Sequence, residues 1–215
     1  PQPAYQDKVK GNDARVLAQN GLAPSEGNPQ FHQQMVYGVA MTTIDRFERA
    51  LGRRAFWADR YTTNAKGRGE STYVPRLRIY PHALRMANAY YIRNKGALLF
   101  GYFPSTEDPS SGQFPGGMVF TCLSHDVVAH ETTHALLDGF HEHFMEATNP
   151  DVLAFHEAFA DIVALFQHFT FPDVLRHQIA RTKGDLRSEN LLAQLAAQVG
   201  HARGTRGALR DAIGK

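Results

Sequence analysis

Two histidines four residues apart constrain the fold of this chain most strongly, because they predict a helix over residues 130–134, which read HETTH. Positions i and i+4 of a helix lie on one face, so the rings of His130 and His134 point the same way. Two such rings can bind one Zn²⁺, and Glu131 beside them is placed to act as a general base. A third ligand must then come from another part of the chain.

The candidate for this third ligand lies in residues 156–161, which read HEAFAD within an apolar stretch. We expect Glu157 to bind the metal. Asp161 lies one turn further along the same helix face, where it can hold a ligand imidazole from behind. Buried charges are usually paired or bound to metal, so we expect Glu157 and Asp161 to be buried. We expect the chain to bind about one zinc ion through His130, His134 and Glu157.

A surface helix that carries two histidines by chance is the alternative to a metal site. The apolar residues 127–129 lead into the motif and instead favour a helix that is at least half buried. The chain has 11 histidines, so the rest need an interpretation as well. Six of those outside the motif have no partner at metal-ligand spacing along the chain: His32, His82, His125, His168, His177 and His201. We expect them to be surface or hydrogen-bonded residues.

Composition excludes several classes of protein. The net charge of +2 over 215 residues comes with scattered basic residues, so no nucleic-acid partner is expected. No apolar run reaches transmembrane length, so no membrane partner is expected either. The single cysteine, Cys122, rules out an intrachain disulfide and is expected to be a buried thiol.

The pattern of apolar residues predicts strands before helices rather than alternating with them, which indicates an α+β fold. Ser124 is the expected N-cap of the metal-binding helix and Gly139 its expected C-cap. Helices are expected over 31–51, from Ser124 onward, over 152–169 and over 188–199, and strands over 77–80 (closed by Pro81), 97–103 and 118–123.

Three parts follow from this pattern. Residues 1–30 are rich in Gln, Asn, Pro and Gly and are expected to form an extended arm. Residues 31–123 are expected to form an N-terminal α/β lobe with a mixed sheet. Residues 124–215 are expected to hold the zinc-binding helices and the start of a helical lobe.

The metal motif together with its surroundings resembles the thermolysin-type zinc endopeptidases, a branch of the gluzincins. The similar segments occur in the family's order and extend over roughly residues 31–212. They are DVVAHETTHA at 126–135, HEAFAD at 156–161, NAYY at 88–91 followed by LLFG at 98–101, and GALR at 207–210.

The resemblance implies a zincin-type fold and assigns further site residues. Asn88 and Ala89 would lie on an edge strand that pairs with the substrate backbone, and Arg210 would bind a substrate carbonyl. His156 stands where the family usually has an Asn that orients the second zinc imidazole. Asp126 matches a calcium ligand of the family, but the helix after Asp161 contains no acid, so Ca²⁺ is the weaker cofactor candidate beside Zn²⁺.

The function that the sequence predicts is zinc-dependent endopeptidase action on a peptide or protein substrate, with Glu131 as general base. Two alternatives remain open. One is a truncated or inactive zinc-binding module, which the missing transition-state donors favour, since residues 140–145 contain no Tyr. The other is a gluzincin aminopeptidase, for which the sequence offers no acidic cluster to hold a substrate amino terminus.

We expect the chain to be an incomplete fragment, because it stops at Lys215, before the family's distal histidine. Its expected partners are therefore its own missing C-terminal portion or a second copy of the chain, with very weak activity alone. The compartment stays open between secretion, which the resemblance implies, and the cytoplasm, which a single Cys and no visible signal peptide allow.

Overall fold

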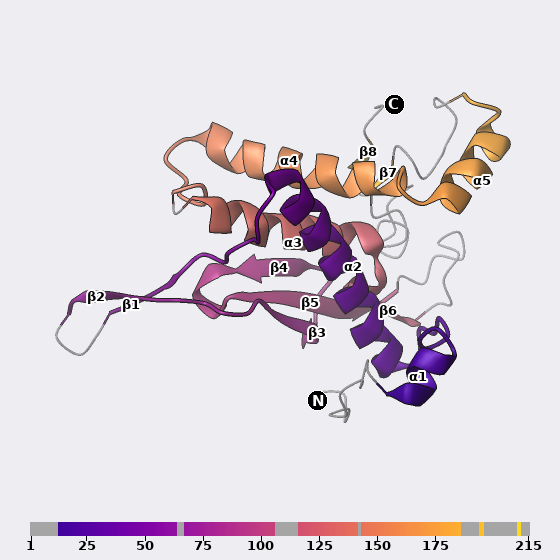
Figure 1. Cartoon of the computed structure of the whole chain (residues 1–215), viewed down its shortest axis with the longest axis horizontal. Helices are drawn as coiled ribbons and strands as arrows, with labels where there is room; N and C mark the ends of the chain where they lie inside the picture. The colour runs from indigo at the N-terminus through magenta and orange to yellow at the C-terminus, as the bar shows by residue number, and fades with distance from the viewer. Residues whose placement is uncertain are drawn as a thin grey trace.

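The computed structural model describes residues 13–63, 67–105, 116–141, 143–185, 194–195 and 210–211. Figure 1 shows the arrangement of its elements. In chain order they are α1 (Ala14–Ala18), α2 (Pro29–Leu51), β1 (Arg60–Thr63), β2 (Gly69–Thr72), β3 (Arg78–Leu84), β4 (Ala89–Ile92), η1 (Arg93–Lys95), β5 (Ala97–Pro104), β6 (Met118–Phe120), η3 (Thr121–Leu123), α3 (His125–Phe140), α4 (Pro150–His168), α5 (Pro172–Thr182), β7 (Gln194–Leu195) and β8 (Arg210–Asp211).

A mixed four-stranded sheet forms the base of the molecule. β5 pairs in parallel with β3 and antiparallel with β4 and β6. The first five residues of β5 are buried, as expected for a central strand. Among the described strands β4 pairs only with β5, so β4 lies at an edge of the sheet. Helices and a mixed sheet confirm the predicted α+β class.

Helices cover the sheet in layers. α3 packs against β4 and β5 on one side and against α4 on the other, and α2 crosses α3 (Figure 1). The buried side chains at these contacts form one core: Val36, Val39, Ala40, Ala89, Leu98, Phe100, Cys122, Val128, Ala129, Ala135 and Ala164. Cys122 is fully buried, which confirms the expectation of a buried thiol, and this burial raises its pKa to about 12.

The ends of α2 follow from local chemistry. The Asn28 side chain accepts a hydrogen bond from the Gln30 N–H, and Pro29 occupies the first helical turn, where its missing N–H costs nothing. Gly52 ends the helix in the left-handed conformation at φ 67°, which glycine adopts without a steric penalty. The helix predicted over 31–51 is confirmed.

Three predicted boundaries are wrong. The segment 118–123 is a strand only as far as Phe120, because Thr121–Leu123 form the 3-10 helix η3. β3 does not stop at Pro81, because the strand runs to Leu84 and its register with β5 shifts between Tyr80 and Leu84. Proline is tolerated at such an irregularity, where no ladder hydrogen bond is required of it. Gly139 is not the C-cap of α3, which ends one residue later at Phe140.

Gly139 has a packing role instead. A Cβ atom at Gly139 would lie 1.9 Å from the carbonyl oxygen of Phe56, so only glycine allows this segment to approach α3 so closely. Ser124 is the N-cap residue as predicted, but its side chain makes no capping hydrogen bond. Its carbonyl oxygen accepts the Val128 N–H at 3.1 Å.

The two ends of the chain differ from the predictions where they are described. The N-terminal arm is not wholly extended, because Ala14–Ala18 form α1. Gln194–Leu195 form β7, which pairs with β8, within the helix predicted over 188–199. No single helix in the described ranges meets the length and apolar composition of a membrane span, although α4 and α5 meet them together as a pair bent by 87°.

Candidate metal centre

α3 brings the two motif histidines together on one face. The Nε2 atoms of His130 and His134 lie 2.9 Å apart, and their side chains are 15% and 10% exposed. The expected half-buried helix is confirmed, since the motif residues Glu131 and His134 are both buried. Two ring nitrogens that converge in a shielded site can bind a cation from the same side.

α4 supplies the third donor. The two carboxylate oxygens of Glu157 lie 3.5 Å from His130 Nε2 and 3.3 Å from His134 Nε2. One ligand atom from each of the three side chains lies within 4.8 Å of the others, so the group could hold a metal ion. Two imidazole nitrogens and one carboxylate form a donor set that suits Zn²⁺. Contrary to expectation, Glu157 is not buried, because half of its side chain is exposed.

Each histidine is also held from behind. The Asp161 carboxylate lies 2.9 Å from His130 Nδ1, and His156 Nδ1 lies 3.1 Å from His134 Nδ1. Such contacts to the second ring nitrogen fix the tautomer and the orientation of a metal-binding imidazole. The predicted supporting residues, Asp161 and His156, therefore meet the two motif histidines at their far ring atoms.

The carboxylates around His130 favour a positive charge at this point. Burial alone lowers the pKa of His130, but hydrogen bonds to Asp161 and Glu157 outweigh it and raise the pKa to about 9. Burial and the neighbouring charge of His130 lower the pKa of His134 to about 4. The carboxylates around the cluster therefore favour one positive charge there, and the His134 ring stays neutral.

Glu131 links the metal cluster to the edge of the sheet. The carboxylate of Glu131 is buried and accepts a hydrogen bond of 2.8 Å from the Tyr91 N–H of β4. This contact joins residues 40 positions apart in the sequence. The candidate general base therefore lies next to His130 on α3 and contacts the outer edge of β4.

The same contact defines which way the backbone of β4 points. Because the Tyr91 N–H faces α3, the N–H of Ala89, two residues earlier, also lies on the outer edge. There the Asn88 side-chain oxygen accepts it at 2.9 Å. Asn88 and Ala89, the predicted substrate contacts, thus lie at the outer edge of the sheet, where Asn88 is exposed to solvent and Ala89 is buried.

A buried polar network, which the sequence reading missed, supports this arrangement. Asp138 is buried; it accepts a hydrogen bond of 2.7 Å from the Tyr91 hydroxyl and lies 3.2 Å from the Arg93 guanidinium. Burial raises the pKa of Asp138, although both partners oppose the rise. Spacing along the chain could have indicated that Asp138 lies near the site, since it follows His134 by four residues and shares its helix face.

Arg210, the predicted carbonyl-binding residue, has its backbone in β8, paired with Leu195 of β7. Its side chain lies outside the described part of the structure. The prediction for Arg210 therefore stays a prediction.

The expectation that the remaining histidines are hydrogen-bonded is confirmed for His125 and His168, which both contact Asp126. Spacing along the chain did not show that they are also part of a possible metal site. His125, Asp126 and His168 form a second group that could hold a metal ion, and His32, His82 and Cys122 form a third. Each group joins residues that are distant in sequence, so linear spacing gave no signal.

Among protein-family models, curated proteins and solved structures, no match to the chain was found.

Proposed function

We infer that this chain is a zinc-dependent peptide hydrolase of the zincin type, acting as an endopeptidase. The observation that carries the proposal is the convergence of His130, His134 and Glu157 beside Glu131, which is itself bonded to an edge strand. A buried acid beside the cluster has no purpose in a purely structural metal site, whereas hydrolysis requires a base.

The cluster suits zinc as the bound metal. Zinc held by His130, His134 and Glu157 would keep a position open for water, lower the pKa of that water towards about 7 and polarise the substrate carbonyl. Asp161 and His156 keep the two imidazoles oriented through their Nδ1 atoms. The Tyr91 N–H keeps the Glu131 carboxylate in place beside the outer edge of β4.

The chemistry assigned to the chain is a proton transfer in two directions. Glu131 takes a proton from the attacking water at a carboxylate oxygen as the new C–O bond forms. It then delivers that proton to the amine nitrogen as the peptide C–N bond breaks. Because one Glu131 oxygen is anchored by the Tyr91 N–H, the carboxylate needs little reorientation between the two steps.

The substrate would bind as an added strand. The Ala89 N–H at the outer edge of β4 is bonded to the exposed Asn88 side chain, whose place a substrate carbonyl would take. An extended peptide that pairs with this edge passes directly by Glu131. Pairing along a strand requires no free substrate amino terminus, which favours an endopeptidase over an aminopeptidase. Arg210 is proposed to grip a neighbouring carbonyl.

Glu131→Gln tests the proposal and separates it from an inactive metal-binding module. We expect the variant to retain zinc but to lose hydrolysis of an N-terminally blocked peptide, because the amide cannot accept the proton. Glu70→Gln is the matched control, since Glu70 is exposed on β2. Unchanged hydrolysis by Glu131→Gln would reject the role of general base. Loss of zinc would instead make Glu131 a ligand.

A further inference from the structure

Three polar contacts cross the interface between α3 and α4 at successive levels. They are Asp126 Oδ1 to His168 Nε2 at 2.5 Å, His130 Nδ1 to Asp161 Oδ1 at 2.9 Å and His134 Nδ1 to His156 Nδ1 at 3.1 Å. The proposed catalytic centre uses the second and third contacts. The first lies at the opposite end of the interface, where α3 begins and α4 ends, and has no part in that centre.

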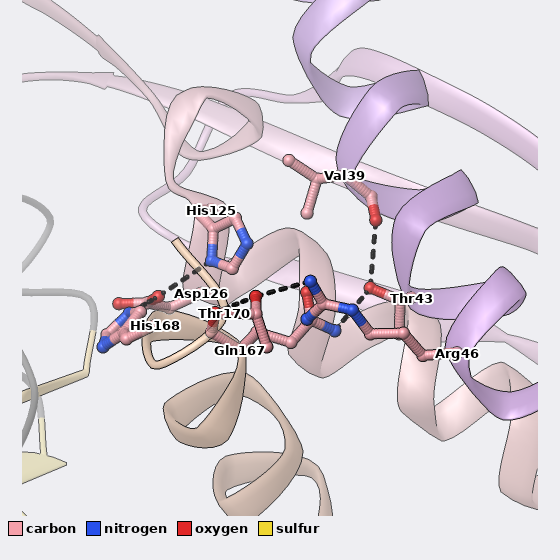
Figure 2. A network of polar contacts seen from close by, with 8 residues as sticks. All are labelled: Val39, Thr43, Arg46, His125, Asp126, Gln167, His168 and Thr170. Atoms are coloured by element: carbon pink, nitrogen blue, oxygen red, sulfur yellow. Dashed lines mark hydrogen bonds and ion pairs between the residues drawn. The ribbon is translucent and has the colours of Figure 1, made fainter. Parts of the chain in front are cut away.

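We propose that His125, Asp126 and His168 bind a second metal ion and that this metal is zinc. Figure 2 shows the two imidazoles on either side of the Asp126 carboxylate. His125 Nδ1 lies 3.3 Å and His168 Nε2 lies 2.5 Å from the same carboxylate oxygen, and one ligand atom from each lies within 4.8 Å of the others. All three side chains are less than a fifth exposed.

The donor types select the metal. Ca²⁺ takes six to eight oxygen ligands, and this group offers one carboxylate between two imidazoles. Two nitrogens and one carboxylate oxygen are the ligands that zinc accepts, with water as a fourth. Asp126, which the family resemblance suggested as a calcium ligand, is therefore assigned to a transition-metal site because its neighbours here are His125 and His168.

The helix ends leave the local field close to neutral. Asp126 lies in the first turn of α3, whose dipole disfavours a cation, and His168 is the last residue of α4, whose dipole favours one. The two dipoles oppose each other, so the negative charge of the Asp126 carboxylate is the main local charge, and it attracts a cation.

The end of α4 is held in place by α2, which prepares His168 for binding (Figure 2). The Thr170 hydroxyl donates to the Gln167 carbonyl and accepts a hydrogen bond from Arg46. The Gln167 amide donates to the Thr43 hydroxyl, a contact that is fully buried. Because Gln167 and Thr170, on either side of His168, are both held by hydrogen bonds, His168 needs little ordering when a metal binds.

The two proposed metal sites share no residue, so substitutions can remove one site at a time. Asp126 and His130 are about 6 Å apart along α3, and Asp161 and His168 are about 10 Å apart along α4, at 1.5 Å per residue. No ligand is shared between the centres. A substitution in the second centre therefore leaves His130, His134 and Glu157 in place, so this inference does not rest on the proposed peptidase activity.

Zinc content tests the inference directly, measured by elemental analysis after zinc loading and removal of unbound metal. We expect about two zinc ions per wild-type chain, about one in His168→Ala and about one in Glu157→Ala. His177→Ala is the control, because His177 is exposed on α5 and should leave both ions bound. Asp126→Asn keeps the shape and one oxygen acceptor of the side chain, so it serves if His168→Ala fails to fold.

The outcomes are distinguishable. One ion in the wild type that Glu157→Ala removes, with no change in His168→Ala, overturns the second centre and leaves the first intact. Two ions in both wild type and His168→Ala overturn it as well and point to the third group at His32, His82 and Cys122. One ion in the wild type that His168→Ala removes, with no loss in Glu157→Ala, supports the second centre and rejects the first.

Discussion

Asp161 offers a quantitative test of the proposed catalytic centre. Its carboxylate lies 2.9 Å from His130 Nδ1, and the Asp161 side chain is only 22% exposed. Asp161→Asn keeps an oxygen that can accept the ring N–H but removes the negative charge. A hydrogen bond to a charged group contributes about 1.5–3 kcal/mol and a neutral one about 0.5–1.5 kcal/mol. The loss of about 1–1.5 kcal/mol corresponds to zinc affinity that is weaker by about tenfold.

Asp161→Ala removes the whole contact, so the loss rises to about 10- to 100-fold. The assay is a competition titration against a chromophoric chelator, carried out in the His168→Ala background so that only the first centre is counted. Asp173→Asn is the control, because the Asp173 side chain is 96% exposed and lies on α5. Equal zinc affinity in Asp161→Asn and its parent would refute the reasoning that Asp161 supports a metal-binding His130.

Two further predictions concern the stability of the fold. Gly139→Ala should lower the free energy of unfolding by about 1–3 kcal/mol, because its Cβ would meet a backbone oxygen at 1.9 Å. Gly38→Ala, in open space on α2, should raise the free energy of unfolding by about 1 kcal/mol. Denaturant melts in which both variants shift the free energy of unfolding in the same direction would contradict this packing. Burial and the neighbouring His32 lower the pKa of His82 to about 4. The unfolded chain therefore takes up a proton at His82 between pH 6.5 and about 4 that the folded chain does not, so stability falls as the pH falls through this window. His82→Asn should flatten this slope, and an unchanged slope in melts at several pH values would contradict the assignment.

Local periodicity was sufficient to predict the elements that carry the site. The spacing of His130 and His134 requires a helix, and the HEAFAD segment lies on a second helix whose apolar residues need a packing partner. The two predicted helices were therefore enough to predict that His130, His134 and Glu157 lie together, without knowledge of the remaining fold. The same reasoning overestimated the burial of Glu157, because the sequence does not reveal which face of α4 meets α3.

The contacts that the sequence did not predict all join distant segments. The Tyr91 N–H reaches Glu131 only because β4 lies against α3, and His168 reaches Asp126 only because α4 returns antiparallel to α3. Neither contact has a characteristic spacing along the chain. The role of Gly139 was mispredicted for a similar reason. A glycine near the end of a helix is typical of a C-cap, whereas Gly139 is required by the close approach of the Phe56 backbone, which is a tertiary contact.

Metal dependence of peptide-bond hydrolysis by the wild-type chain is the most direct test of the central proposal. The measurement is cleavage of casein by zinc-loaded protein, by the same protein after chelation and by the chelated protein after zinc is restored. We predict hydrolysis that disappears with chelation and returns with zinc, in proportion to the metal held by His130, His134 and Glu157. Hydrolysis that persists in the chelated protein, or none in a chain with that centre fully loaded, would contradict the proposal.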